Sequence, residues 1–422
     1  MNKRAFWLGL GGIALAALAV RVAYVLVVAR HLPLIGDAQT YHLLARNLAH
    51  GRGYVRPHEL AATGRALPSA EFPPLFPFLL AAVVKLGGAT VTSQKLAMAG
   101  LGTGTVVVLG LLGRAVVSPT VGLVAAALAA VHPMLFGIDG ALMSETPYVL
   151  LIAVTLLAAF WVARAPESRN RWIALGAVIG LAALTRGEAL ALVALVVVPL
   201  AAARRMFVAG TIAVVTTLLV LTPWTARNYI RFHALVPVSD NTTGVLVGAN
   251  CPPTYQGRFE GLWLFSCYGR VDVRGLDEPD AFRRYGRAGL SHARHHAGHV
   301  PRVMAIRWLR TFGLFRPGQQ VSWETLEGRD HRWQTVGTRF EWALYPLAIS
   351  GAIALRWRRV LMWPLLSTVG LASLTTIATY GNQRFRAAAE PALVVLAAAT
   401  LVEVTRRIVR RGVEAHPELP VS

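Results

Sequence analysis

About ten apolar segments, each near the length needed to cross a membrane, dominate the chain. A perpendicular span needs roughly 20 apolar residues, because a helix rises about 1.5 Å per residue through a hydrocarbon layer of about 30 Å. Inside that layer only helices or closed barrels satisfy the backbone hydrogen bonds. We therefore predict an all-α polytopic membrane protein with spans at about 5–29, 94–114, 119–137, 145–165, 171–186, 187–203, 206–223, 340–356, 359–379 and 388–405.

The composition agrees with a membrane protein. Hydrophobic residues make up 55% of the 422 residues and charged residues 15%, which excludes an ordinary soluble enzyme. The formal charge of +21 would suggest a nucleic-acid partner in a soluble protein. Here much of that charge lies in short loops between apolar runs, and no nucleic-acid motif is present. We expect contact with membrane lipids and no nucleic acid.

The segment 73–88 decides the topology. It is short, opens on several prolines and ends at Gly87-Gly88. If it re-enters the membrane or lies at its surface, the basic loops all fall on the cytoplasmic side, as the positive-inside rule requires. We therefore predict ten spans, both termini cytoplasmic and a retained signal anchor at 5–29, in a bacterial inner or plasma membrane.

The chain divides into four regions on this basis. The segment 224–339 is too polar to span and too long for a passive linker. It contains Cys251 and Cys267, and an extracytoplasmic location makes a disulfide plausible, the alternative being two small apolar residues in a folded loop. The regions are an N-terminal module at 1–223 with a first loop at 30–93, the extracytoplasmic segment at 224–339, C-terminal spans at 340–405 and a cytoplasmic tail at 406–422.

Asp37 carries the most functional information. It follows the first span directly and begins a short amphipathic segment that includes Tyr41. An acid at this depth is costly unless it has a role. It could simply cap the amphipathic helix, or its carboxylate could take a proton from a bound hydroxyl.

Five motifs occur in order on the extracytoplasmic side of this topology. Together they resemble the GT-C glycosyltransferases of the protein mannosyltransferase and lipid A aminoarabinose transferase type. The motifs are Asp37-x3-Tyr41-x3-Ala45-x5-Gly51 with Pro73-Pro74-Leu75, Ser144-Glu145-Thr146-Pro147, Gly180 to Arg186, Pro223-Trp224-x2-Arg227-Asn228, and Arg384-Phe385-Arg386-x4-Pro391.

The resemblance implies a GT-C helical bundle that takes a sugar from a polyprenyl-phosphate carrier at the outer leaflet, with inversion at the anomeric carbon. The position that matches the family's general base is Asp37. A phosphate leaving group needs no general acid, but its growing charge needs fixed cations, which arginine supplies. We expect Arg384 and Arg386 to do this first, then Arg227 and Arg186; the alternatives are interfacial snorkelling and ordinary ion pairs.

Two positions depart from the family pattern. The aminoarabinose transferases have a lysine before Pro-Pro-Leu, where this chain has Phe72, so another residue must contact the phosphate. The protein mannosyltransferases have a glutamate after the first acid, where this chain has Ala38. The sugar and the acceptor, which could be a lipid, a glycan or a protein, therefore do not follow from the resemblance.

Three further residues are candidates for substrate binding: Tyr41, Arg46 and Glu145. Glu145 begins a span, so its alternative role is a charge that the helix dipole favours. We expect Glu188 to pair locally with Arg186.

Cofactors are not expected. Four histidines recur at helical spacing, but no acid or cysteine accompanies them and their surroundings are basic, so an exposed or interfacial helix face is the better interpretation. A nucleotide-sugar site is not indicated, and Gly100-x-Gly102-x-Gly104 lies within a span, where it favours close helix packing. The histidines are His292, His295, His296 and His299.

Two other functions compete with glycosyl transfer. A transporter or lipid flippase predicts an inverted repeat and broken helices at the membrane midplane, and neither is evident. Arg21 is the one charge near the centre of a span. A non-catalytic scaffold would leave Asp37, the Pro-Pro-Leu segment and the Arg384/Arg386 pair without a shared reason.

Overall fold

The computed structural model describes residues 1–415, and these residues form a helical protein. Within them the extended pairing is limited to one isolated bridge, between Val55 and Pro68. The predicted all-α class is therefore confirmed. The last seven residues of the predicted tail, 416–422, lie outside the described part, and residues 406–415 continue the last helix.

The helices fall into two sets. The first set forms the elongated bundle: α1 (Lys3–Val27), α5 (Val91–Val116), α6 (Pro119–Val131), α8 (Glu145–Arg164), α9 (Arg169–Ala183), α10 (Val198–Arg204), α11 (Phe207–Phe232), α17 (His331–Trp357), α18 (Trp363–Ala378) and α19 (Glu390–Ala415). The second set lies outside this group: α2 (Asp37–Ala49), α3 (Pro57–Thr63), α4 (Leu75–Lys85), α7 (Pro133–Ala141), α12 (Asn241–Ala249), α13 (Pro252–Tyr255), α14 (Glu278–His295), α15 (Val300–Thr311) and α16 (Pro317–Glu324).

Five stretches of helix are long and apolar enough to cross a membrane, and a sixth is added if α6 and α7, which meet at a 52° bend, count as one span. The chain is thus an integral membrane protein. The count of ten spans is not confirmed. The remaining predicted spans coincide with α9, α17, α18 and α19, which are shorter or less apolar than the others.

Close packing of small residues holds the bundle together. A Cβ atom added at Gly113 of α5 would lie 2.9 Å from the Cα of Gly122 in α6, so the two backbones touch at this crossing. Close packing was expected at the glycines of 100–104, and it is seen at Gly102, where the absence of a side chain leaves room for the carboxylate of Asp139. That carboxylate pairs with Arg21 at 2.8 Å, which satisfies the one charge near the middle of the first span.

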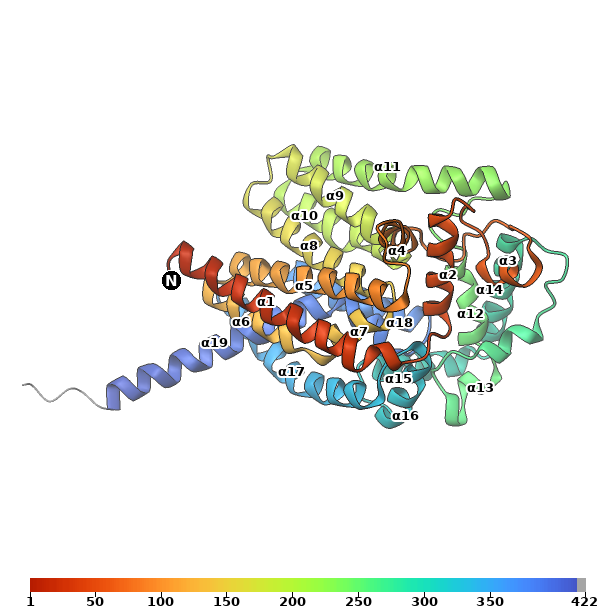
Figure 1. Cartoon of the computed structure of the whole chain (residues 1–422). Helices are drawn as coiled ribbons and strands as arrows, with labels where there is room; N and C mark the ends of the chain where they lie inside the picture. The colour runs from red at the N-terminus through yellow and green to blue at the C-terminus, as the bar shows by residue number, and fades with distance from the viewer. Residues whose placement is uncertain (416–422) are drawn as a thin grey trace, which may run out of the picture.

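The second set of helices gathers at one end of the bundle. Figure 1 shows α2, α3, α12, α13 and α14 at this end and the N-terminus of α1 at the opposite end. We call the first of these the polar end. Helix α4 is seen nearly end-on, so it lies across the direction of α5 and α11. Such an orientation fits a segment that does not cross the membrane beside them.

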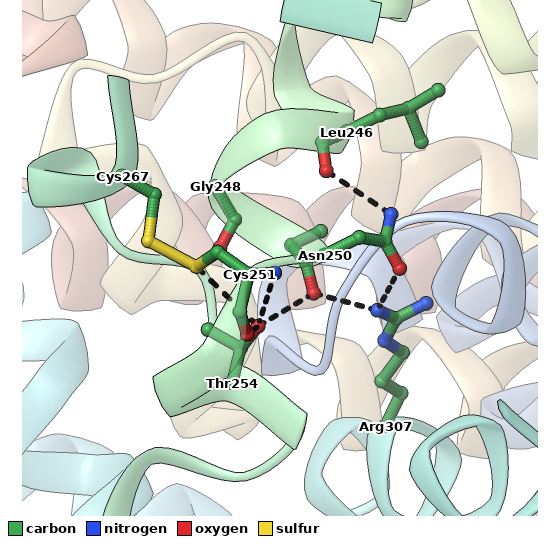
Figure 2. Close-up of a disulfide and its surroundings, with 8 residues drawn as sticks. Leu246, Gly248, Asn250, Cys251, Thr254, Cys267 and Arg307 are labelled. Carbon is green, nitrogen blue, oxygen red and sulfur yellow. Dashed lines mark hydrogen bonds between the residues drawn. A yellow bond between two sulfur atoms is a disulfide. The ribbon is translucent and has the colours of Figure 1, made fainter. Parts of the chain in front are cut away.

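A disulfide and a buried arginine organise the segment between α11 and α17. Cys251 and Cys267 are bonded, with 6.4 Å between their Cα atoms (Figure 2). Next to them, the Nη2 atom of Arg307 donates to the backbone oxygen of Ala249 at 2.7 Å and to Oδ1 of Asn250 at 2.8 Å. These contacts tie α12 and α13 to α15.

Candidate active site

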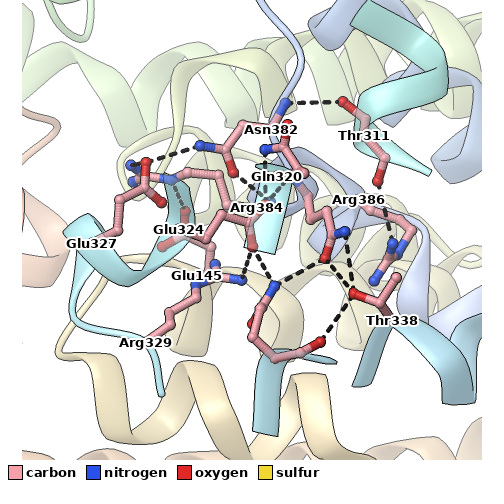
Figure 3. Close-up of polar contacts among 12 residues, drawn as sticks. Glu145, Thr311, Gln320, Glu324, Glu327, Arg329, Thr338, Asn382, Arg384 and Arg386 are labelled. Carbon is pink, nitrogen blue, oxygen red and sulfur yellow. Dashed lines mark hydrogen bonds and ion pairs between the residues drawn. The ribbon is translucent and has the colours of Figure 1, made fainter. Parts of the chain in front are cut away.

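Arg384 is the centre of an ion-pair cluster at the polar end. It lies on the short 3-10 helix η8 (Gln383–Ala388), which precedes α19. Its Nε atom is 2.5 Å from Oε1 of Glu145, and its Nη1 atom is 3.0 Å from Oδ2 of Asp37. Glu327 approaches the same Nη1 atom at 3.6 Å. Figure 3 shows Arg384 between Glu145 and Glu327. One guanidinium therefore joins segments that are far apart in sequence.

Asp37 is the accessible acid of this cluster. It is the first residue of α2 and follows Gly36, whose positive φ of 58° is strained for residues with a Cβ atom. The side chain of Asp37 is 38% exposed, whereas that of Glu145 is fully buried. A substrate that approaches the polar end can therefore reach Asp37 directly.

Glu145 is shared between two arginines. Its Oε1 atom also accepts from Nη1 of Arg186 at 2.5 Å. The Nε atom of Arg186 pairs with Glu188 at 2.6 Å, which is the local ion pair expected from the sequence. The ring of Phe385 lies under the same guanidinium, 5.4 Å away. Removal of one partner of a buried ion pair costs about 3–5 kcal/mol, because the other charge is left unpaired. The two arginines therefore both stabilise the buried carboxylate of Glu145.

Two residues of the cluster had no signal in the sequence. Glu327 follows α16 on the 3-10 helix η7 (Thr325–Glu327), and burial raises its pKa, an effect that Arg384 partly opposes. Arg329 is only 4% exposed, and its Nε and Nη2 atoms have no hydrogen-bond partner. Its Nη1 atom lies 3.4 Å from Glu324. Donors buried without partners are costly, which makes Arg329 a candidate for ligand binding.

Arg227 holds the first loop against α11. Its Nη1 atom donates to the backbone oxygen of Ser69 at 2.6 Å, and its Nη2 atom to that of Tyr54 at 2.7 Å. The guanidinium also lies over the ring of Trp224, 4.9 Å from its centroid. These contacts occupy the side chain with protein groups, so it shapes the loop that carries Asp37.

In the described part of the chain, the other two predicted substrate-binding residues form no hydrogen bond or ion pair with Arg384. Tyr41 is 2% exposed and packs against Phe72 and Phe76, with both ring-centroid distances at 4.8 Å. Phe72, which stands where the related transferases have lysine, thus belongs to an aromatic cluster. Arg46 has an exposed side chain on α2, and no ion pair of it is seen in the described residues.

Arg386 does not join the Arg384 cluster, although the two residues are close in sequence. Its side chain is fully buried and pairs with Glu390 at 2.8 Å and with Glu341 at 3.3 Å. On a 3-10 helix of about three residues per turn, positions two apart point in widely different directions. The predicted role of Arg386 as a phosphate ligand has no support in this geometry.

A second group of acids lies in the loops beside the first. Burial, together with the carboxylates of Glu278 and Asp37, raises the pKa of Glu71 to about 8. Burial, together with the carboxylates of Glu278 and Glu71, raises the pKa of Asp240 to about 9. Glu278 is paired with Arg56 at 3.0 Å. The first two acids therefore hold protons at neutral pH, which lowers the negative charge around Asp37.

One group of residues in the described part could hold a metal ion by distance alone: His132, Glu341 and Glu390, whose ligand atoms lie within 4.8 Å of one another. It is separate from the Arg384 cluster. Of the four histidines singled out in the sequence, His292 and His296 stack at 4.1 Å and the carbonyl of His292 contacts Nδ1 of His296.

Comparison with known proteins gives a family match and a shared fold. The family described as dolichyl-phosphate-mannose-protein mannosyltransferase matches residues 71–226. The apo oligosaccharyltransferase of Archaeoglobus fulgidus matches 100% of this chain with a TM-score of 0.58 and 13% identity, and 53% of its own chain is covered. The same enzyme with an inhibitory peptide and a dolichol-phosphate has a TM-score of 0.55 and 11% identity, with 100% and 53% coverage.

ArnT from Cupriavidus metallidurans, bound to undecaprenyl phosphate, has a TM-score of 0.45 and 14% identity, with 99% of this chain and 82% of that chain covered. No curated protein sequence matches the chain significantly. The chain spans about half the length of the archaeal oligosaccharyltransferase, and identities this low show a common fold. The match at 71–226 and the shared fold together confirm the resemblance to GT-C glycosyltransferases of the protein mannosyltransferase type.

Proposed function

We propose that the protein is a membrane glycosyltransferase that moves a sugar from a polyprenyl-phosphate carrier to an acceptor hydroxyl at the extracytoplasmic face. The observation that carries the proposal is the accessible carboxylate of Asp37, held by the buried Arg384–Glu145 pair at the polar end of a GT-C bundle. The matched family and the dolichol-phosphate complex of the archaeal neighbour support the donor class.

In this proposal Asp37 is the general base. The acceptor hydroxyl is a poor nucleophile, and a carboxylate within hydrogen-bond reach takes its proton as the oxygen attacks the anomeric carbon. The bond from that carbon to the phosphate oxygen breaks in the same step, and its electron pair leaves with the phosphate. A single displacement of this kind inverts the configuration of the sugar. The Arg384 contact at 3.0 Å holds the carboxylate of Asp37 in place before the acceptor binds.

Arginines at the polar end stabilise the leaving phosphate. Arg384 already lies beside Asp37, so a phosphate bound to it would compete with that carboxylate and release it to act as base. Arg329 offers two buried donor atoms without partners. We assign the phosphate to Arg384 and Arg329, with Arg186 in support through Glu145. Arg227 and Arg386 are assigned to structure, because their donors are bound to protein groups.

Charge balance supports a role for these cations. Without a substrate, the cluster contains more carboxylates than guanidiniums in direct contact. Arg329 adds a third cation nearby. A phosphate bound here would therefore contact Arg329, whose Nε and Nη2 atoms have no partner, or displace a carboxylate from Arg384.

The acceptor enters from the side of Asp37. Glu145 is too buried to contact it and instead positions Arg384 and Arg186. We propose that acceptor choice depends on the segment 224–339, whose α12, α14 and α16 cover the polar end. No metal is assigned to transfer: the arginines contact the carboxylates that a cation would otherwise bind.

The experiment that tests the function is a donor panel in expression-matched membranes. Radiolabelled polyprenyl-phosphate sugars are supplied one at a time, and lipid, glycan and protein fractions are examined for label. We expect transfer from at least one donor, with the product of inverted anomeric configuration by NMR. Retention of configuration would contradict a single displacement from Asp37, and the absence of transfer from every donor would contradict the donor class.

A further inference from the structure

Four side chains inside the bundle form a cluster that the proposed chemistry does not use directly. They are His132, Glu341, Arg386 and Glu390, and we call them the buried quartet. His132, Glu341 and Arg386 are fully buried, and Glu390 is 3% exposed. Groups of this kind are kept only when they are paired.

The quartet joins three parts of the fold. The Nε2 atom of His132 lies 3.0 Å from Oε1 of Glu341 and 3.4 Å from Oε2 of Glu390. Arg386 contacts the same two carboxylates at 3.3 Å and 2.8 Å. His132 is at the 52° bend between α6 and α7, Glu341 is within α17 and Glu390 starts α19. Through these two glutamates, Arg386 is linked to the bend between α6 and α7.

Arg386 also donates two hydrogen bonds outside the quartet. Its Nη1 atom donates to the backbone oxygen of Thr311 at 3.2 Å and to the hydroxyl of Tyr345 at 3.1 Å. That hydroxyl donates in turn to the backbone oxygen of Phe312 at 3.1 Å. Figure 3 shows Arg386 pointing toward Thr311, away from Arg384.

The geometry favours an ion-pair network over a metal centre. The backbone N–H of Met134 points at Nδ1 of His132 at 3.3 Å, so Nδ1 carries the lone pair and Nε2 carries the hydrogen. In this tautomer the Nε2 atom lies within ion-pair distance of the two glutamates and has no lone pair for a cation. Arg386 also places its own positive charge against both carboxylates.

We propose that the buried quartet positions Arg384, so that His132, Glu341, Arg386 and Glu390 are positioning residues for the reaction. Arg386 is two residues after Arg384 on the same short helix η8, and a rigid hold on one fixes the backbone of the other. The quartet thereby sets the distance from Arg384 to Asp37 and Glu145. This inference rests on the role proposed above for Arg384.

Glu341→Gln tests the proposal, because it keeps the size of the side chain and removes the charge that Arg386 and His132 share. Asp139→Asn is the matched control: it removes the carboxylate of another fully buried ion pair, with Arg21, without touching η8. We expect Glu341→Gln to lower kcat at least about tenfold with acceptor KM within about twofold, since small misplacements of catalytic groups cost this much or more.

A second readout does not depend on transfer. Hydrogen–deuterium exchange of residues 382–389 reports the order of η8 even if no donor is found. We expect exchange there to become faster in Glu341→Gln and to stay at the wild-type rate in Asp139→Asn. If Glu341→Gln does not fold, Tyr345→Phe removes one contact to Arg386 and is expected to give the same changes to a smaller extent.

Three results would overturn the proposal. The first is an unchanged exchange rate in both Glu341→Gln and Tyr345→Phe. The second is equal acceleration in the Asp139→Asn control. The third is a stoichiometric metal ion in the purified protein that His132→Asn removes, which would make the cluster a metal centre. Loss of order at η8 in a protein that transfers no sugar would refute only the proposed function.

Discussion

Replacement of Arg384 by glutamine tests both the packing and the chemistry of the site. The change leaves Glu145, which is fully buried, with one guanidinium instead of two. Loss of one member of a buried pair costs about 3–5 kcal/mol, and the remaining Arg186 contact places the expected loss near the lower end, about 3 kcal/mol. In the mechanism proposed above, the same substitution also removes a cation from the leaving phosphate, a loss typically worth about 10²–10³ in kcat.

A double variant separates the two effects. Glu145→Gln combined with Arg384→Gln removes the unpaired charge, so most of the lost stability should return while kcat stays low. Unfolding free energy is measured by denaturant titration in mixed micelles, and kcat by transfer in the same preparation. The matched control is Arg274→Gln, since Arg274 is 90% exposed in its pair with Asp272 and such exposed pairs contribute little to stability.

Either of two results would contradict these roles of Arg384. One is a loss of less than about 1 kcal/mol in Arg384→Gln, which would mean that Glu145 does not depend on Arg384. The other is recovery of kcat in the double variant together with stability, which would mean that Arg384 acts only through packing.

Three further predictions concern the loops and the metal dependence. Because Glu71 has a folded-state pKa of about 8, above its ordinary value of 4.5, the folded protein holds a proton that the unfolded chain loses, and stability falls as pH rises from about 5 to 8. Glu71→Gln should flatten that decline in melting curves; an unchanged pH dependence would contradict the raised pKa. Reduction of the Cys251–Cys267 bond, which links residues 16 apart, should lower stability by about 3 kcal/mol, and a melting temperature unaffected by reductant would argue against this. Treatment with EDTA should leave the transfer rate unchanged, so a loss restored by added divalent cations would show a metal requirement.

The segments that form the site could be predicted because each lies at the end of an apolar run. Asp37 follows the first run, Glu145 and Arg186 flank others, and Arg384 precedes the last. Once the positive-inside rule had placed these ends on one side, they had to be near one another. The structure brings all four into contact.

Other parts of the site depend on contacts that periodicity does not reveal. Arg386 differs from Arg384 in its partners because η8 is a short 3-10 helix and not a continuation of α19. Glu327 and Arg329 come from a polar loop with no apolar pattern, and their burial follows from tertiary packing. The number of spans was less predictable still, because short or partly charged helices can be buried inside a bundle.

The most direct test of the central claim is the single-turnover transfer rate of Asp37→Asn in membranes, measured beside wild type and the control Asp272→Asn. Asp272 is an acid of the segment 224–339 whose side chain is 56% exposed. General-base catalysis typically contributes about 10²–10⁴-fold, so we predict a loss of that size in Asp37→Asn and none in the control, with equal expression. A rate for Asp37→Asn within about tenfold of wild type would contradict the assignment of Asp37 as the base.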